Sequence, residues 1–332
     1  MKAAIRAIAS HLPEAVLTND AIAAAFPDWP ADKIEKKLGV RERRISGAQE
    51  YTSNLAVAAA ERLFLQTGVD RATVDTLILV TQTPDYLLPT TACIVQQELR
   101  LPCKLAAFDL NLGCSGFVYA LSVAKGLIES GSSRRLLLIT ADTYSKLLDP
   151  EDQSVRTLFG DAAAATLIEG IESDRPLIGP FEFGTDGSCA NHLIAPGTAM
   201  RGRSADALPC LRMSGPEIFA FTLRVVPPSV ESVLAQAGLT LEQIDLFVFH
   251  QANGYMLEHL RQKCRIPREK FVVAMAECGN TVSTSIPLAL IHALEGGQLA
   301  SGARVLLAGF GVGASWASCL LEWIEPRPAG PA

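Results

Sequence analysis

Aromatic residues are scarce in this chain of 332 residues, since only 6% of them are Phe, Tyr or Trp. Hydrophobic residues as a whole nevertheless make up 49%, which is enough for a large core and for two domains or a pair of similar halves. A core of small aliphatic side chains favours closely packed layers of helices and sheets over a β-sandwich.

Long apolar runs and an excess of basic charge are also missing. No stretch of about 18 uninterrupted apolar residues occurs, which argues against a membrane-spanning helix. The first ten residues, MKAAIRAIAS, contain Arg6 within the apolar run, so they predict a first strand and not a signal peptide. The net charge of −6 makes nucleic acid an improbable partner. We expect a cytoplasmic protein that binds neither membranes nor nucleic acid.

Paired cysteines are absent too, although the chain has eight cysteines. None of them belongs to a C-x-x-C pair, and their scattered positions predict neither a disulfide framework nor a zinc site. Reduced thiols in a cytosolic protein are the plain interpretation.

An internal repeat organises the chain. Residues 66–75, QTGVDRATVD, align with residues 236–245, QAGLTLEQID, at an offset of 170 residues. The same offset places residues 113–121, GCSGFVYAL, on residues 283–291, STSIPLALI. Because strands alternate with helices in both halves, we expect parallel sheets covered by helices. Ligands of such sheets gather beyond the carboxyl ends of the strands.

One cysteine, Cys114, lies where a strand is followed by a helix. The apolar run KLAAF precedes it, and SGFVYALSVAKGLIES after it has apolar residues at helical spacing. A thiol at the start of a helix is near the positive end of the helix dipole, so we expect its pKa to be lowered. Taken alone, a buried cysteine that only packs is the commoner case.

Two further polar residues have equally ordinary explanations when each is taken alone. His250 ends the apolar run DLFVFH, where a histidine is often a core or surface residue. Asn280 follows glycine in ECGNTVSTS, where an asparagine is often a turn residue or a helix N-cap. Together with Cys114, however, they can converge on one point where the repeated halves meet.

The chain resembles the β-ketoacyl-acyl carrier protein synthase III family, which are condensing enzymes of the thiolase fold. The resemblance covers nearly the whole chain and implies an α/β thiolase-like fold, in which two pseudo-symmetric α/β halves form a five-layer αβαβα arrangement. We expect one half at residues 1–172, with the nucleophilic cysteine, the other at 173–325, with the histidine and the asparagine, and a disordered tail at 326–332. The motifs follow the family's order: LGVRERRI (38–45), AFDLNLGCSGFVYAL (107–121), LFGDAAAATLIE (158–169), LRMSGPEIF (211–219), HQAN (250–253), GNTVSTSIPLAL (279–290) and GFGVGASWAS (309–318).

The resemblance implies the chemistry of the three polar residues. Cys114 takes an acyl group from a thioester, while its own N–H and the N–H of Val312 stabilise the oxyanion. Malonyl-acyl carrier protein then loses CO₂, and His250 and Asn280 both donate hydrogen bonds to its thioester oxygen.

The family pattern also assigns residues that contact the substrates. Phe159 is expected to line the acyl pocket, and the small residues Gly113 and Gly116 to leave room for the acyl carbonyl. Leu88 matches a residue that a second subunit inserts into the acyl pocket. The family commonly has Phe there, so the smaller Leu suggests room for a longer or branched chain. The residues that match the channel for the pantetheine arm are Met213, Gly215, Phe219, Ala252 and Asn253.

Several residues depart from the family pattern. Gln153 and Tyr255 stand where bacterial housekeeping enzymes tend to have Arg, and Lys33 stands where an aromatic residue commonly stacks on adenine. Family members usually have glycine at the position of Val312. These departures leave open whether the acyl donor is a CoA ester. The basic run RQKCR (261–265) fits a solvated helix face better than a dock for an acidic carrier protein.

The expected partners are an acyl-CoA or acyl-carrier-protein donor, malonyl-acyl carrier protein and a second copy of the chain in a homodimer. We expect no metal and no redox cofactor. An acyltransferase or a non-decarboxylating condensing enzyme of secondary metabolism is the main alternative activity. A non-catalytic subunit is disfavoured because all three polar residues are present. A thiol hydrolase or cysteine protease shares the Cys, His and Asn set, but nothing else in the sequence supports it.

Overall fold

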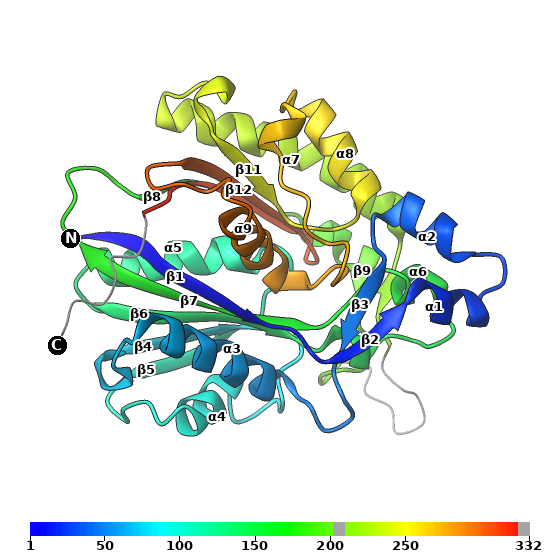
Figure 1. The fold of residues 1–332 in the computed structure, drawn as a ribbon, viewed down its shortest axis with the longest axis horizontal. Coiled ribbons are helices and arrows are strands. Elements are labelled where there is room, and N and C mark those ends of the chain that lie inside the picture. Colours follow the sequence, from blue (N-terminus) through cyan, green and yellow to red (C-terminus); the bar gives the residue numbers. More distant parts are fainter. Residues whose placement is uncertain (202–209, 325–332) are drawn as a thin grey trace.

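Two β-sheets form the centre of the chain (Figure 1). The computed structural model describes residues 1–201 and 210–324. The first sheet has the strand order β1-β7-β6-β4-β5 and the second has the order β11-β12-β13-β8. The strands of the first sheet are β1 (Lys2–His11), β4 (Thr76–Val80), β5 (Ala106–Leu110), β6 (Arg135–Asp142) and β7 (Ala162–Ile171). Those of the second sheet are β8 (Ile178–Thr185), β11 (Leu246–Phe249), β12 (Arg304–Gly311) and β13 (Ser315–Glu322).

Helices cover and separate the sheets, so that five layers are stacked (Figure 1). Two helices, α3 and α4, cover the outer face of the first sheet, while α5 and α9 lie between the two sheets. The outer face of the second sheet is covered by α7, with α8 beside it. This αβαβα order confirms the predicted fold class. The helices are α3 (Thr52–Thr67), α4 (Thr91–Glu98), α5 (Gly116–Glu129), α7 (Gly215–Ala237), α8 (Gly254–Lys263) and α9 (Ser285–Glu295).

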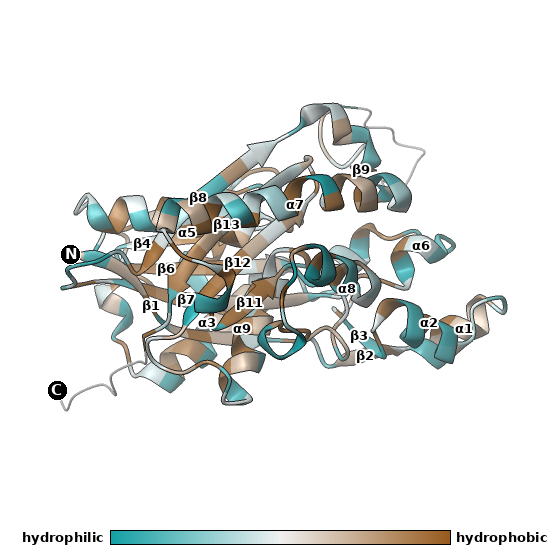
Figure 2. Cartoon of the chain, turned by 90° about the horizontal axis from the view of Figure 1, so that it is seen from above, coloured by the Kyte–Doolittle hydropathy of each residue, from teal (hydrophilic) through white to brown (hydrophobic). Residues whose placement is uncertain are grey.

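Shorter elements gather at one end of the layers, where the strands of both sheets lead (Figures 1 and 2). Apolar residues concentrate in the strands and the inner helices, and the short elements are more polar (Figure 2). The short elements at this end include two antiparallel strand pairs and three helices: β2 (Ala15–Thr18) with β3 (Glu42–Ile45), β9 (Leu193–Ile194) with β10 (Arg212–Met213), α1 (Asn19–Ala25), α2 (Ala31–Leu38) and α6 (Gln153–Arg156).

The sheets are mixed, and the expectation of wholly parallel sheets was wrong. Strand β4 is parallel to β5 and β6, and β11 is parallel to β12, but β7 and β13 run antiparallel to their neighbours. A parallel pair needs a crossover, usually a helix that packs on the sheet. Only residues 312–314 separate β12 from β13, so that pair can form only an antiparallel hairpin.

The internal repeat is visible in the strand order and in equivalent hydrogen bonds. The order β1-β7-β6-β4 of the first sheet corresponds to β8-β13-β12-β11 of the second. The carboxylate of Asp75 accepts a hydrogen bond from the N–H of Arg134 at 2.7 Å, and that of Asp245 accepts one from Arg304 at 2.8 Å. Both members of the second pair lie 170 positions after those of the first, the offset seen in the sequence.

The middle layer joins the halves through one buried cluster. This cluster takes side chains from α5 and α9 and from both sheets, with Phe117 of α5 and Leu290 of α9 fully buried. The boundary predicted at residue 172 lies between β7 and β8, the last strand of one sheet and the first of the other. Because the halves share this core, their description as separate domains remains a prediction. The tail predicted at 326–332 lies outside the described residues.

Helix α7 is the one described helix that is long and apolar enough to cross a membrane. More than half of its apolar window is buried in the protein, and the helix packs against β8, β12 and β13. These contacts explain its apolar composition by its place in the core.

Replacing Phe117 tests the role of the middle layer. Phe117→Ala removes a fully buried ring from the cluster that both sheets share, and we expect a loss of about 3–5 kcal/mol in the free energy of unfolding. Val123→Ala on the same helix is the control, since Val123 is partly exposed, and its loss should stay below about 1 kcal/mol. Urea denaturation followed by circular dichroism measures both. Equal losses would show that the ring is not part of a shared core.

Candidate active site

Cys114 lies between the end of β5 and the start of α5. The strand ends at Leu110 and the helix begins at Gly116, so the five residues 111–115 connect them. The N–H of Gly116 donates to the carbonyl of Gly113 at 2.7 Å, which closes the turn around Cys114. The sequence therefore located this strand-to-helix junction correctly, although the strand lies two residues later than its apolar pattern suggested.

His250 follows β11, at the corresponding end of the second sheet. Its N–H donates to the carbonyl of Ala308 on β12 at 2.8 Å, which extends the parallel pairing to the histidine. Its Nδ1 and the Oγ of Ser285, the first residue of α9, are 2.7 Å apart. This contact fixes the ring, because Ser285 is itself held by the carbonyl of Val282 at 3.0 Å.

Asn280 belongs to a loop that pairs with a segment of the first half. Its N–H donates to the carbonyl of Leu158 at 2.9 Å, and its carbonyl accepts from Gly160 at 3.0 Å. Its Oδ1 accepts from the N–H of Val282 at 3.0 Å. With Oδ1 occupied in this way, the Nδ2 amide group is the one left to donate to a ligand.

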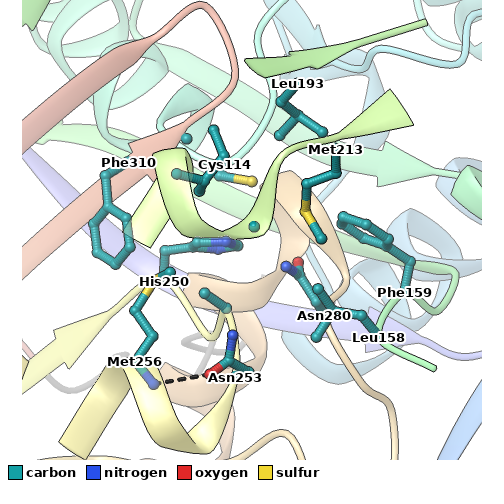
Figure 3. Close-up of a pocket in the computed structure, with 14 residues that line it drawn as sticks. Cys114, Leu158, Phe159, Leu193, Met213, His250, Asn253, Met256, Asn280 and Phe310 are labelled. Carbon is teal, nitrogen blue, oxygen red and sulfur yellow. Dashed lines mark hydrogen bonds between the residues drawn. The ribbon is translucent and has the colours of Figure 1, made fainter. Parts of the chain in front are cut away.

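The three polar residues line one pocket (Figure 3). The pocket and its mouth enclose about 480 Å³ of empty space. Cys114, His250 and Asn280 are all buried, and they come from three loops that are far apart in the sequence. The convergence that the sequence predicted is thus present.

Most of the residues predicted to contact the substrates line this pocket, but Phe219 and Leu88 do not. The ring of Phe219 lies against Tyr255 and His259 of α8, at 5.5 Å and 5.4 Å between ring centroids. Leu88 is 80% exposed in the loop before α4, so it contributes nothing to the pocket of its own chain. The predicted residues that do line the pocket are Phe159, Met213, Gly215, Ala252 and Asn253.

Six lining residues were missed. Leu158, Phe310 and Gly311 belong to segments whose motifs had been noted, and their positions close to the predicted residues Phe159 and Val312 could have indicated them. The other three come from a short strand and two helices whose inward faces depend on tertiary packing. These are Leu193, Ile218 and Met256.

Val312 contributes its backbone N–H to the surroundings of the Cys114 thiol, and its side chain does not line the pocket. The backbone N–H groups of Cys114 and Val312 face the Cys114 thiol and act to lower its pKa. Two converging N–H groups at a nucleophile are the arrangement of an oxyanion hole. The Gly311 position beside them must be a glycine, because a Cβ there would lie 3.1 Å from the Cys114 Sγ.

The expectation that Gly113 and Gly116 leave room for substrate was wrong. A Cβ at Gly113 would lie 2.3 Å from the Gln82 Oε1 and 2.7 Å from a methyl group of Val312. At Gly116 it would lie 2.5 Å from a methyl group of Val80. Both glycines are therefore required by close packing of protein atoms.

The expectation of a lowered pKa for Cys114 was also wrong. Burial raises the pKa of the thiol to about 12, and the negative charge of Asp142 acts in the same direction. The two N–H groups lower it, but they do not outweigh the loss of solvent. In the absence of substrate the sulfur is therefore a neutral thiol.

The imidazole of His250 is neutral as well, because burial lowers its pKa to about 3. When Ser285 donates to Val282, the imidazole proton is on Nδ1 and Nε2 can accept a proton. When the serine hydroxyl turns to donate to Nδ1, Nε2 carries the proton and can donate. The site thus offers either a proton acceptor or a hydrogen-bond donor without a charged histidine.

Basic residues that could have served the substrate are partly engaged within the chain. Arg261 pairs with Glu258 at 2.7 Å, and Lys263 donates to the carbonyl of Leu223 at 2.8 Å. Lys33 and Lys37 belong to α2, and Trp29 lies in the loop before it. The amino groups of these two lysines lie 5.2 Å and 4.8 Å from the ring centroid of Trp29. Residues 1–201 and 210–324 contain no group of three or more His, Cys, Asp or Glu side chains that could hold a metal ion.

Comparisons with known proteins agree with this geometry. Residues 108–187 match the family described as 3-oxoacyl-[acyl-carrier-protein] synthase III, and residues 234–323 match its C-terminal part. A β-ketoacyl-[acyl-carrier-protein] synthase III of Halalkalibacterium halodurans is 38% identical over 98% of both chains.

Solved structures show the same relationship. A crystal structure of a 3-oxoacyl-(acyl-carrier-protein) synthase III matches with a TM-score of 0.95 and 51% identity, covering 97% of this chain and 100% of the other. The priming β-ketosynthase of the R1128 polyketide pathway matches with a TM-score of 0.91 and 31% identity, covering 98% and 97%.

The neutrality of His250 predicts a dependence of stability on pH. The unfolded chain binds a proton at His250 below about pH 6.5, whereas the folded chain does so only near pH 3, so stability falls as the pH drops below 6.5. His250→Asn removes the titrating imidazole and, with it, this contribution to the dependence of stability on pH. Between pH 6.5 and 5 we expect the wild type to lose about 1–2 kcal/mol more than the variant. Urea denaturation across this range measures it, and parallel curves would contradict the assignment.

Proposed function

Because the chain belongs to the 3-oxoacyl-[acyl-carrier-protein] synthase III family, we propose that it joins an acyl thioester to malonyl-acyl carrier protein through Cys114, His250 and Asn280. The observation that carries the proposal is the convergence of these three side chains on one pocket from three separate loops. The relatives are condensing synthases. Our proposal concerns the roles of Cys114, His250 and Asn280 in this chain.

In the first half-reaction Cys114 becomes acylated. Because the pKa of its thiol is about 12, Cys114 needs a base to remove the proton. Nε2 of His250 takes this proton in the tautomer whose Nδ1–H donates to the Ser285 hydroxyl. The sulfur forms a bond to the acyl carbon while the N–H groups of Cys114 and Val312 stabilise the oxyanion. The carbon–sulfur bond of the donor then breaks, and the leaving thiolate takes the proton from Nε2.

In the second half-reaction malonyl-acyl carrier protein loses CO₂. The Ser285 hydroxyl turns to donate to Nδ1 of His250, so that the imidazole proton is now on Nε2. The Nδ2 of Asn280 and this Nε2 donate to the malonyl thioester oxygen, which carries the enolate charge. The enolate carbon forms a bond to the acyl carbon, the bond to the Cys114 sulfur breaks, and the sulfur regains a proton from solvent. Both donors are neutral and buried, so they stabilise the new charge strongly.

The surroundings of the pocket suggest how the substrates enter. Met213, Gly215, Ala252 and Asn253 line the pocket and suit the pantetheine arm of a CoA or carrier-protein thioester. The thioesters serve as substrates, and the proposed chemistry calls for no metal or redox cofactor. We also propose a homodimer that works in the cytoplasm, with no membrane or nucleic acid as partner.

Acylation of Cys114 tests the proposal. After incubation with a panel of acyl-CoA and acyl-carrier-protein thioesters, intact-mass spectrometry should show one acyl adduct, and peptide mapping should place it on Cys114. Cys114→Ala should give no adduct, while Cys319→Ala, at a buried thiol of β13, should keep it. An adduct that survives in Cys114→Ala would refute the assigned nucleophile.

Release of CO₂ from malonyl-acyl carrier protein separates a decarboxylating synthase from an acyltransferase.

Asn280 should affect only the second half-reaction. Asn280→Ala removes the Nδ2 donor, so we expect release of CO₂ from malonyl-acyl carrier protein to fall by about 10²–10³-fold. Formation of the Cys114 adduct should change by less than about threefold. A loss of both activities in a folded variant would mean that Asn280 positions Cys114 and does not act in decarboxylation.

Leu88 tests the expected homodimer. The loop carries three exposed apolar residues, Tyr86, Leu87 and Leu88, which would be covered if a second copy received them. If Leu88 of the second copy limits the acyl pocket, Leu88→Phe should shift the preferred donor to shorter chains. A profile of adduct formation against chain length measures this. An unchanged profile in a dimeric variant would exclude Leu88 as the determinant.

A further inference from the structure

Asp142, the last residue of β6, is a buried carboxylate that the mechanism above does not use. The groups that donate to it are neutral. Its Oδ1 accepts from the N–H of Gln82 at 2.8 Å and from the hydroxyl of Thr81 at 3.3 Å. Its Oδ2 accepts from the hydroxyl of Ser283 at 2.5 Å. A buried carboxylate held only by neutral donors is costly, which makes a role beyond packing worth testing.

One side of this network leads to Cys114. Gln82, which follows β4, packs its carboxamide against Gly113, the residue before Cys114. The Oε1 of Gln82 also accepts a hydrogen bond from the buried hydroxyl of Tyr144 at 2.8 Å. By holding the N–H of Gln82, Asp142 therefore positions the segment on which the Cys114 turn rests.

The other side leads to Asn280. Ser283 belongs to the 3-10 turn Val282–Thr284, which connects the Asn280 loop to α9. The first residue of that turn, Val282, donates its N–H to the Asn280 side chain. A single carboxylate of the first half thus holds the turn of the second half that orients the amide.

The charge of Asp142 also reaches the nucleophile. Burial raises the pKa of Asp142 to about 7, although its hydrogen bonds act against this. The ionisable groups that feel its charge are Cys114, from the turn after β5, and Tyr144, from the segment after β6. For both, burial and the carboxylate together raise the pKa.

We propose that Asp142 is a positioning residue that joins the Cys114 turn to the Asn280 turn, and that its negative charge opposes formation of the Cys114 thiolate. Protonation of this one carboxylate therefore eases ionisation of the thiol. The proposal rests on the proposed function only in taking Cys114 as the reactive thiol.

Alkylation of Cys114 by iodoacetamide tests the charge without any acyl substrate. The rate constant, measured by mass spectrometry of the Cys114 peptide, should rise with pH in the wild type but show an inflection near pH 7, where Asp142 ionises. In Asp142→Asn the inflection should vanish. The ratio of the variant rate to the wild-type rate should be near 1 at about pH 6 and should approach about 10 above pH 8. A ratio of about 10 corresponds to a change of about one in the pKa of the thiol.

Asp75→Asn is the matched control. Asp75 also accepts backbone and hydroxyl hydrogen bonds, but it lies before β4, at the opposite end of the sheet from Asp142. This variant should keep the wild-type inflection. A ratio for Asp142→Asn that differs from 1 but does not change with pH would show a structural effect only and would overturn the proposed role of the charge, as would a ratio of 1 throughout.

A second variant keeps the proposal testable if Asp142→Asn does not fold. Ser283→Ala keeps the carboxylate but removes its shortest hydrogen bond, so the inflection should move to higher pH, and release of CO₂ from malonyl-acyl carrier protein should fall. An unchanged inflection would overturn the role of Ser283 in holding the carboxylate. If acyl adducts form on Cys114 while the inflection is missing, this proposal fails and the proposed function stands.

Discussion

The burial of three polar side chains at the junction of two sheets is the constraint on which the rest of the structure depends. Polar groups that lose water must find partners within the protein. Here the backbone around Asn280 pairs with the segment at Leu158, and His250 is held by Ser285. Because the pairing of Asn280 with the segment at Leu158 crosses between the halves, the site exists only when both sheets are in place.

Burial also decides the ionisation of the site. The same loss of solvent that raises the pKa of Cys114 lowers that of His250, so sulfur and imidazole are both neutral before substrate arrives. We infer that a neutral site of low polarity suits an uncharged thioester. It stabilises negative charge only when the reaction creates it, through N–H groups that are already oriented.

The sequence predicted much of the fold and the centre of the site. The offset of 170 residues anticipated two similar sheets, and Cys114, His250 and Asn280 were identified from strand ends and from the family resemblance. It did not predict the antiparallel strands β7 and β13. It also misjudged the pKa of Cys114, since the helix terminus is visible in the sequence but the depth of burial is not.

The sequence alone determined which chemical groups are available, because each lies beside a local pattern of strand, turn and helix. Only the tertiary structure decided their environment. Phe219 matches the family pattern but turns toward Tyr255 and His259, and Ile218 beside it lines the pocket, because the packing of α7 on the second sheet fixes which side of the helix faces inward. Such long-range contacts leave no periodic signal in the chain, so neither the inward face of a helix nor the depth of a thiol could be predicted from the sequence.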